Sequence, residues 1–202
     1  MKLVFTWIQW CGKWTQAKLL VDKYDFKLVE MWWVLRSIAK EDSELGRSVK
    51  ETIVAWHQVS PEIVWKIIKK TVETETHDRV IYDWFVRNEW NKETMDQACP
   101  DYKVVFFELS KDKAIERLLW RMYDPVSWET FPTWTLENPV SWTKLIKRKD
   151  DNEDSILTRI NAFFEKTLPI VDLQRNEWRV IDINADKSIN EVALEMVKKL
   201  DL

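Results

Sequence analysis

The sequence is poor in glycine, cysteine and histidine: of its 202 residues, 2 are Gly, 2 are Cys and 2 are His. Two cysteines are too few for a disulfide framework, and neither Cys11 nor Cys99 has a Cys or His at metal-ligand spacing. His57 and His77 lie in polar stretches without a second ligand, which is typical of surface histidines. We therefore expect reduced thiols, no zinc and a cytoplasmic location.

Long hydrophobic runs and a strong charge of one sign are also missing. No apolar run approaches the roughly 18 residues that a membrane-spanning helix needs. The 31 Lys and Arg residues nearly balance the 34 Asp and Glu residues, which gives a formal net charge of −3. This balance excludes a basic nucleic-acid coat and a disordered acidic tail. We expect neither nucleic acid nor membrane as a partner, and the length fits one domain, with or without an inserted lid.

The glycine deficit is matched by an excess of tryptophan. Ordinary chains carry roughly 7% Gly, which would be about 14 residues at this length, whereas this chain has 2 Gly and 14 Trp. Neutral drift at glycine positions in loops would also introduce Ser, Asn, Asp and Ala. The replacement of glycine by tryptophan alone therefore needs another cause. We hypothesise an alternative genetic code, in which the source organism reads as glycine a codon translated here as tryptophan. A deliberate glycine-to-tryptophan replacement is the alternative.

Apolar runs and helical periodicities alternate along the chain. Strands are predicted at residues 2–6, 79–82, 103–109 and 178–183, with a weaker one at 27–31. Helical spacing is predicted over 15–24, 34–40, 43–55, 60–72, 89–97, 111–122, 153–175 and 188–200. Ser60 before Pro61, Ser110 and Ser188 have the character of helix N-caps. The alternation predicts an α/β fold in which helices cover both faces of a parallel sheet.

Residues 123–147 differ from the rest because no helical period is present and Pro and Trp interrupt the segment repeatedly. The segment is too apolar to be disordered, so we expect a small, hairpin-rich lid insertion. It contains no Cys or His, which argues against a zinc-stapled lid. The predicted organisation is a core over 1–122, the lid over 123–147, and completion of the core by 148–202.

The segment after the first predicted strand has the character of a phosphate-binding loop. Gly12, Lys13 and Thr15 stand between a strand and a helix. Such loops point backbone N–H groups at a phosphate from a helix N-terminus, while the Lys reaches the outer phosphates. The strict pattern fails, because Trp7 occupies the opening glycine position and the hydroxyl residue comes one place late. Read with glycine at the tryptophans, the loop becomes Gly-x-x-Gly-x-Gly-Lys-Gly-Thr-Gln.

Four further blocks follow this loop in a fixed order. They are Arg36 after Val34-Leu35, Asp83-Trp84-Phe85-Val86-Arg87, the run from Glu116 to Arg121, and Arg148-Lys149-Asp150-Asp151 with Arg159. With Gly12, Lys13, Thr15, Gln16 and Ala17, these blocks resemble adenylate kinase, and more broadly the nucleoside monophosphate kinases, over essentially the whole length.

The resemblance implies a P-loop NTPase-like, five-stranded parallel sheet with a helical monophosphate-binding segment at about 30–60. It implies reversible phosphoryl transfer from MgATP to AMP, giving two ADP, by a monomer. Another acceptor, UMP or CMP, is an open alternative. A catalytically dead scaffold is a second one, if the tryptophans are real. A protein interaction module with exposed aromatic patches ranks last, because it would leave the arginine blocks unexplained.

The resemblance also implies a role for each matching residue. The catalytic residues would be Lys13, Arg87, Arg121, Arg148 and Arg159. ATP would contact Gly12, Lys13, Trp14, Thr15, Arg117 and Arg121. The monophosphate would contact Met31, Arg36, Val59, Trp84, Arg87 and Asn91, and Asp83 would hold Mg²⁺ through water. Guanidinium groups suit these roles because they clamp phosphate oxygens in pairs and stabilise the charge of the transition state.

Departures from the family pattern concern base selectivity and the loop itself. Met31 stands where a Thr is usual, Trp33 where an acidic residue is common, Val86 where Pro is usual, and Asn91 near the expected Gln. Trp7, Trp10 and Trp14 fall in a loop whose glycines adopt positive φ. A bulky residue there costs on the order of 1–3 kcal/mol, so the sequence as written predicts an obstructed ATP site.

Overall fold

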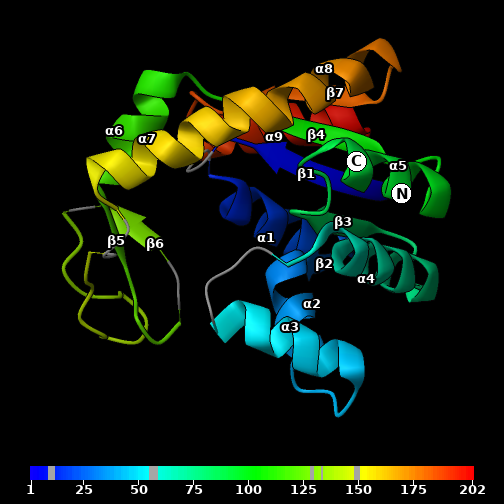
Figure 1. The fold of residues 1–202 in the computed structure, drawn as a ribbon. Helices are drawn as coiled ribbons and strands as arrows, with labels where there is room; N and C mark the ends of the chain where they lie inside the picture. Colours follow the sequence, from blue (N-terminus) through cyan, green and yellow to red (C-terminus); the bar gives the residue numbers. More distant parts are fainter. Residues whose placement is uncertain (9–11, 55–58, 128–129, 133, 148–150) are drawn as a thin grey trace.

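The computed structural model describes residues 1–8, 12–54, 59–127, 130–132, 134–147 and 151–202 (Figure 1). Its centre is a five-stranded sheet in the order β2-β3-β1-β4-β7, in which every neighbouring pair is parallel. The strands are β1 (Lys2–Trp7), β2 (Lys27–Glu30), β3 (Val80–Asp83), β4 (Lys103–Glu108) and β7 (Val180–Asn184). The predicted α/β fold with a five-stranded parallel sheet is confirmed.

Two apolar clusters lie on opposite faces of this sheet, because successive side chains of a strand point to opposite sides. On β1, Leu3 and Phe5 belong to one cluster, whereas Val4 belongs to the other. The first cluster takes residues from α1 (Lys13–Tyr24), α6 (Lys111–Leu119), α7 (Glu153–Ala162) and α9 (Ile189–Leu200). The second takes residues from α2 (Met31–Ile38), α3 (Glu44–Val54), α4 (Pro61–Thr74) and α5 (Glu89–Ala98). Burial on both faces explains why the central strands β1, β3 and β4 each contain a continuous apolar stretch.

The predicted helix starts are confirmed at three serines. Ser60 accepts a hydrogen bond from the Ile63 amide, ahead of Pro61 at the start of α4. Ser110 caps α6 in the same way. Ser188 forms a reciprocal capping box with Glu191 at the start of α9. These side chains satisfy amide groups that have no partner inside the helix.

Four predicted boundaries were wrong for local reasons. The strand predicted at 27–31 ends at Glu30, because Met31 begins α2. Helix α1 begins at Lys13 rather than at residue 15, directly after Gly12. The last strand begins at Val180 rather than at 178, because Trp178 has a φ of 58°. The helix predicted over 111–122 ends at Leu119, since Arg121–Tyr123 pairs as β5 with β6 (Thr130–Pro132).

The helix predicted over 153–175 consists of three parts. Helix α7 leads into a π-helical turn, η1 (Phe163–Thr167), which continues as α8 (Leu168–Asn176). Together they run along one side of the sheet in Figure 1, in yellow and orange. The buried positions continue at a spacing of three and four across the junction, at Ile156, Ile160, Phe163 and Thr167. The hydrophobic period therefore gave no sign of the π turn.

A small antiparallel sheet, β5-β6, begins at Arg121, two residues before the predicted insertion, and stands to one side of the main sheet (Figure 1). Asp124 is fully buried beneath it and accepts hydrogen bonds from the amides of Val126 and Ser127 and from the side chains of Asn138 and Ser141. These bonds replace the apolar packing that so short a segment cannot provide. In the described part of the chain, no helix is long and apolar enough to cross a membrane.

Candidate active site

The carboxyl ends of two neighbouring strands bring the predicted phosphate loop and a carboxylate together. Strand β1 ends at Trp7 and strand β3 at Asp83, while Gly12 precedes α1 with a φ of 85°. Lys13 is the first residue of α1. Parallel α/β sheets bind ligands at this edge, where helix N-termini also point. Gly12, Lys13 and Asp83, which were identified from the sequence, therefore converge on one place.

Lys13 and Asp83 form an ion pair through Nζ and Oδ2. Asp83 is only 5% exposed, and its Oδ1 has no hydrogen-bond partner among the described residues. Burial raises the pKa of Asp83, and the Lys13 ammonium lowers it in part. A buried, half-satisfied carboxylate beside a phosphate loop is suited to a ligand that brings hydrogen-bond donors.

Glu30 lies directly opposite Asp83, at the end of β2. Burial raises the pKa of Glu30 and the negative charge of Asp83 raises it further, against the opposing effect of Lys13. Glu30 was not among the site residues predicted from the sequence. Its position at the end of a predicted strand was the available signal, but the sequence does not show which strands are neighbours.

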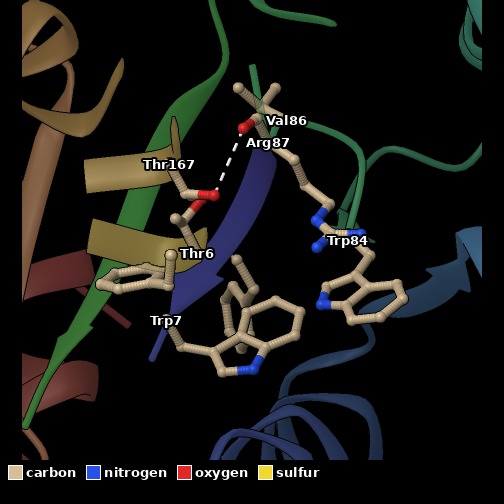
Figure 2. Close-up of a pocket in the computed structure, with 8 residues that line it drawn as sticks. Thr6, Trp7, Trp84, Val86, Arg87 and Thr167 are labelled. Atoms are coloured by element: carbon tan, nitrogen blue, oxygen red, sulfur yellow. Dashed lines mark hydrogen bonds between the residues drawn. The ribbon is translucent and has the colours of Figure 1, made fainter. Parts of the chain in front are cut away.

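Two indoles stand over this edge of the sheet, and Figure 2 shows them on either side of a hollow. Trp7 and Trp84 stack with their ring centroids 6.3 Å apart and their planes 16° from parallel. The Lys13 Nζ lies 3.4 Å from the centroid of Trp7. Arg87 places its guanidinium carbon 4.3 Å from the centroid of Trp84. The two cations expected to meet phosphates therefore face tryptophan rings in the chain as written.

The Arg87 backbone is held by the π-helical turn. The Thr167 hydroxyl donates a 3.2 Å hydrogen bond to the Arg87 carbonyl, drawn as the dashed line in Figure 2. Thr167 ends η1, and π turns occur frequently at functional sites. This contact joins the segment after β3 to the helix that carries Arg159.

Asp151 joins two of the expected catalytic arginines. It accepts two hydrogen bonds from the Arg121 guanidinium and a third, of 3.1 Å, from Nη2 of Arg159. The Asp151 side chain is fully buried. Arg121 lies on β5 and Arg159 on α7, so one carboxylate ties the small sheet to the helix that follows it. Asp151 lies in one of the sequence blocks that carry the resemblance. Its neighbours in the sequence are also charged, so the sequence alone does not show that the Asp151 carboxylate is buried.

Arg117 contacts a different part of the molecule. Its Nη1 donates a 3.1 Å hydrogen bond to the carbonyl of Ala185, and its Nη2 lies 3.8 Å from an Asp186 carboxylate oxygen. Both residues belong to the loop after β7, so the structure separates Arg117 from the Arg121–Asp151–Arg159 group. This separation is compatible with the distinct role, near the ATP base, that the resemblance implies for it.

The residues expected to bind the monophosphate lie on or beside α2, α4 and α5. Arg36 stacks on Trp32 and Trp33, at 4.7 and 5.3 Å from the ring centroids. Met31 and Asn91 are buried, and Val59 is half-buried just before α4. Trp14 and Thr15 are exposed on the first turn of α1, whereas Arg148 lies outside the described residues.

The donor set at the sheet edge fits magnesium held through water. Among the described residues, no group of three or more His, Cys, Asp and Glu side chains could hold a metal directly. Mg²⁺ retains several waters and uses one or two carboxylates plus phosphate oxygens. The unpartnered Oδ1 of Asp83 can accept a hydrogen bond from such a water. The absence of zinc stays a prediction.

Known proteins match this chain along its length. The family model for adenylate kinase matches residues 9–178. An adenylate kinase of Alkaliphilus oremlandii is 28% identical over 214 residues, which cover 99% of this chain and 98% of that relative. Those of Francisella philomiragia and Borrelia recurrentis are 26% identical and cover 99% and 100% of this chain, and 100% and 98% of their own lengths. The chain therefore belongs to the adenylate kinase family and is a nucleoside monophosphate kinase, a phosphotransferase.

Proposed function

We propose that the protein transfers a phosphoryl group reversibly from MgATP to AMP, giving two ADP. The observation that carries this proposal is the meeting of Lys13, at the start of α1, with Asp83, at the end of the adjoining strand β3. The relatives named above are adenylate kinases, which supports AMP as the acceptor. The alternative acceptors UMP and CMP, which the departures at Met31 and Asn91 left open, are not favoured by these relatives.

Each proposed catalytic group acts by position and charge. Lys13, Arg121, Arg148 and Arg159 would surround the transferred phosphoryl group and stabilise the negative charge on its oxygens. Arg36 and Arg87 would hold the monophosphate in line for attack, and Arg117 would lie by the ATP base. Bound Mg²⁺ would neutralise phosphate charge, and Asp83 would hold it through water. Gly12, Trp14 and Thr15 would line the phosphate loop, with Val59 and Trp84 beside the monophosphate.

Residues 123–147 would close as a lid over the reacting groups and exclude water. The Arg121–Asp151–Arg159 contacts support this proposal, because they couple the base of the insertion to α7. We also propose a cytoplasmic monomer that acts on small nucleotides rather than on nucleic acid or membranes. The free, buried thiol of Cys99 is in keeping with a reducing compartment.

We further propose that the working protein carries glycine at most of the tryptophan positions. Trp84, Trp142 and Trp178 have φ values of 68°, 58° and 58°, a region that bulky residues rarely enter and that glycine adopts freely. Most of the described tryptophans are also exposed, up to 89% for Trp178, although tryptophan is a highly buried residue type on average. Glycine at Trp7 and Trp84 would remove both indoles that face Lys13 and Arg87.

The first experiment is the intact mass of the protein purified from its own source. A mass with glycine at the tryptophan positions supports a changed codon meaning and an open phosphate loop. A mass with 14 tryptophans overturns the decoding proposal and favours the scaffold.

The second experiment measures ADP formation with AMP, UMP and CMP as acceptors. Lys13→Ala should lower kcat by about a hundredfold or more, because it removes a charge aimed at the transition state. Lys18→Ala, on the exposed face of the same helix, is the matched control and should retain the parent rate. ADP formation at the parent rate without Lys13 contradicts the proposed mechanism.

A further inference from the structure

We propose that Glu30 is the second carboxylate of the magnesium site and holds a metal-bound water beside Asp83. This inference rests on the proposed function, because MgATP must bind at this edge of the sheet. It adds a residue to the site, since the role implied by the resemblance concerned Asp83.

The sheet places the two carboxylates side by side. Glu30 ends β2 and Asp83 ends β3, and the two residues are direct partners in the parallel register. Directly paired residues of neighbouring strands project from the same face of a sheet. Both side chains therefore leave the sheet on one side, next to the helix N-terminus that begins at Lys13.

The hydrogen bonds at Asp83 leave room for one more donor. Its Oδ2 is bonded to Lys13, whereas its Oδ1 is buried and has no partner in the described part of the chain. An unpaired buried carboxylate oxygen is costly. A water molecule polarised by a cation is a strong donor, and a second carboxylate on the other side can accept its remaining proton.

The charges favour the same ligand. Glu30 and Asp83 place two negative charges at the edge where Lys13 and Arg87 are the cations proposed to meet phosphates. A divalent cation held through water by these carboxylates would offset their repulsion of the phosphates, because Mg²⁺ keeps several waters and uses one or two carboxylates together with substrate phosphates. The side chain of Glu30 is half-buried and accepts a hydrogen bond from the Trp33 side chain.

The test measures metal binding directly, with Mn²⁺ as the probe. The full chain is prepared with glycine or tryptophan at the 14 positions, whichever the intact mass shows. Its complex with ATP is titrated with Mn²⁺, and electron paramagnetic resonance measures the concentration of free Mn²⁺. Glu30→Gln should weaken Mn²⁺ binding to the ATP complex by about tenfold, the scale of an outer-shell metal partner. Metal-free ATP should bind as in the parent. Glu30→Asp, which keeps the charge, should recover part of the Mn²⁺ affinity.

Glu108→Gln is the matched control, because Glu108 is an exposed carboxylate at the same end of the sheet on β4. It should leave Mn²⁺ affinity unchanged. Unchanged Mn²⁺ affinity in Glu30→Gln overturns the inference while the proposed function stands. A parent chain that binds no ATP even without metal overturns both. An equal loss in Glu30→Gln and Glu108→Gln also overturns it, because the effect is then general surface charge.

Discussion

Aromatic residues lie in opposite environments in the buried sheet and in its rim, by which we mean the helix surfaces and loops around the sheet. Phe5, Phe107 and Tyr82 are at most 1% exposed and form the centre of the two apolar clusters. None of the tryptophans that the structure describes is buried. They lie on helix surfaces, in loops and at the carboxyl ends of the sheet strands. Hydrophobic burial thus explains the phenylalanines and tyrosines, but it does not explain the tryptophans.

Backbone conformation sets three of the described tryptophans apart from the others. Asp25 and Asp201 have positive φ at helix C-caps, where a short polar residue is tolerated. Trp178 has that conformation directly after the C-cap of α8, where glycine is the usual residue. Trp84 and Trp142 have it outside the helices and strands. At these three positions the backbone therefore has a conformation suited to glycine, while the side chain is that of the largest residue type.

The largest expected effect is at the phosphate loop. In the chain made with tryptophan, replacing Trp7, Trp10 and Trp14 by glycine should raise ADP formation by about a hundredfold or more, because small misplacements of reacting groups cost that much. Initial rates with ATP and AMP measure this gain. Replacing Trp134, Trp142 and Trp178, which are exposed and outside the loop, is the control. An equal gain in both triple variants would refute an obstruction specific to the loop.

The buried aromatic residues should dominate stability. Phe107→Ala should lower the free energy of unfolding by about 3–5 kcal/mol, because it opens a cavity in the packed core. Phe107 contacts Phe5 edge-on, with centroids 5.1 Å apart. Urea unfolding measures the loss, and Phe164→Ala, at a side chain 37% exposed, should cost clearly less. Equal losses at the two positions would break the comparison between core and rim.

The small sheet should respond to acid through Asp124. Burial would raise the pKa of Asp124, but donors from Val126, Asn138, Ser127 and Ser141 lower it to about 2. The folded pKa lies below the unfolded value of about 3.9, so the stabilisation is present above that pH and is lost as pH falls toward 2. Hydrogen exchange of amides in 123–147 measures this loss. Asp124→Asn should flatten it, and an unchanged acid response in that variant would refute the role of Asp124.

The smallest effect, and the sharpest test of the backbone argument, compares two single replacements. Trp178→Gly should raise the free energy of unfolding by about 1 kcal/mol, because it relieves a left-handed backbone strain of about 1–2 kcal/mol. Trp65→Gly, inside α4, should lower it by about 1 kcal/mol, the helical cost of glycine. Thermal unfolding of both variants measures the two signs. Changes of the same sign would show that φ does not distinguish the positions.

The sequence predicted the sheet well because its strands are short apolar runs bounded by caps and turns. It did not predict β5, because Arg121–Tyr123 continues the apparent helical period of the preceding segment. The pairing partner of β5 is β6, which lies outside that segment. The π turn was hidden because burial at Ile160, Phe163 and Thr167 keeps a helical spacing. Such features depend on tertiary partners that no local window contains.

The site was predictable to a similar depth. Lys13 and Asp83 stand in recognisable motifs, and the structure brings them together as an ion pair. Glu30 and Asp151 were not assigned roles, because a carboxylate at a strand end or in a charge run shows nothing of its neighbours. Their importance follows from the register between β2 and β3 and from the burial of Asp151 between two arginines.

The strand order also determines when each part of the sheet can be covered during translation. The sheet is centred on β1, and β2, β3 and β4 have all emerged once residue 108 has left the ribosome. The outer edge of β4 is unpaired until β7 has been made, and part of α1 is uncovered until α9, which packs against it, has been made. Apolar surface on β4 and α1 therefore stays open to solvent and to chaperones until β7 and α9 have been made, so the sheet cannot be fully covered before residue 200 has left the ribosome.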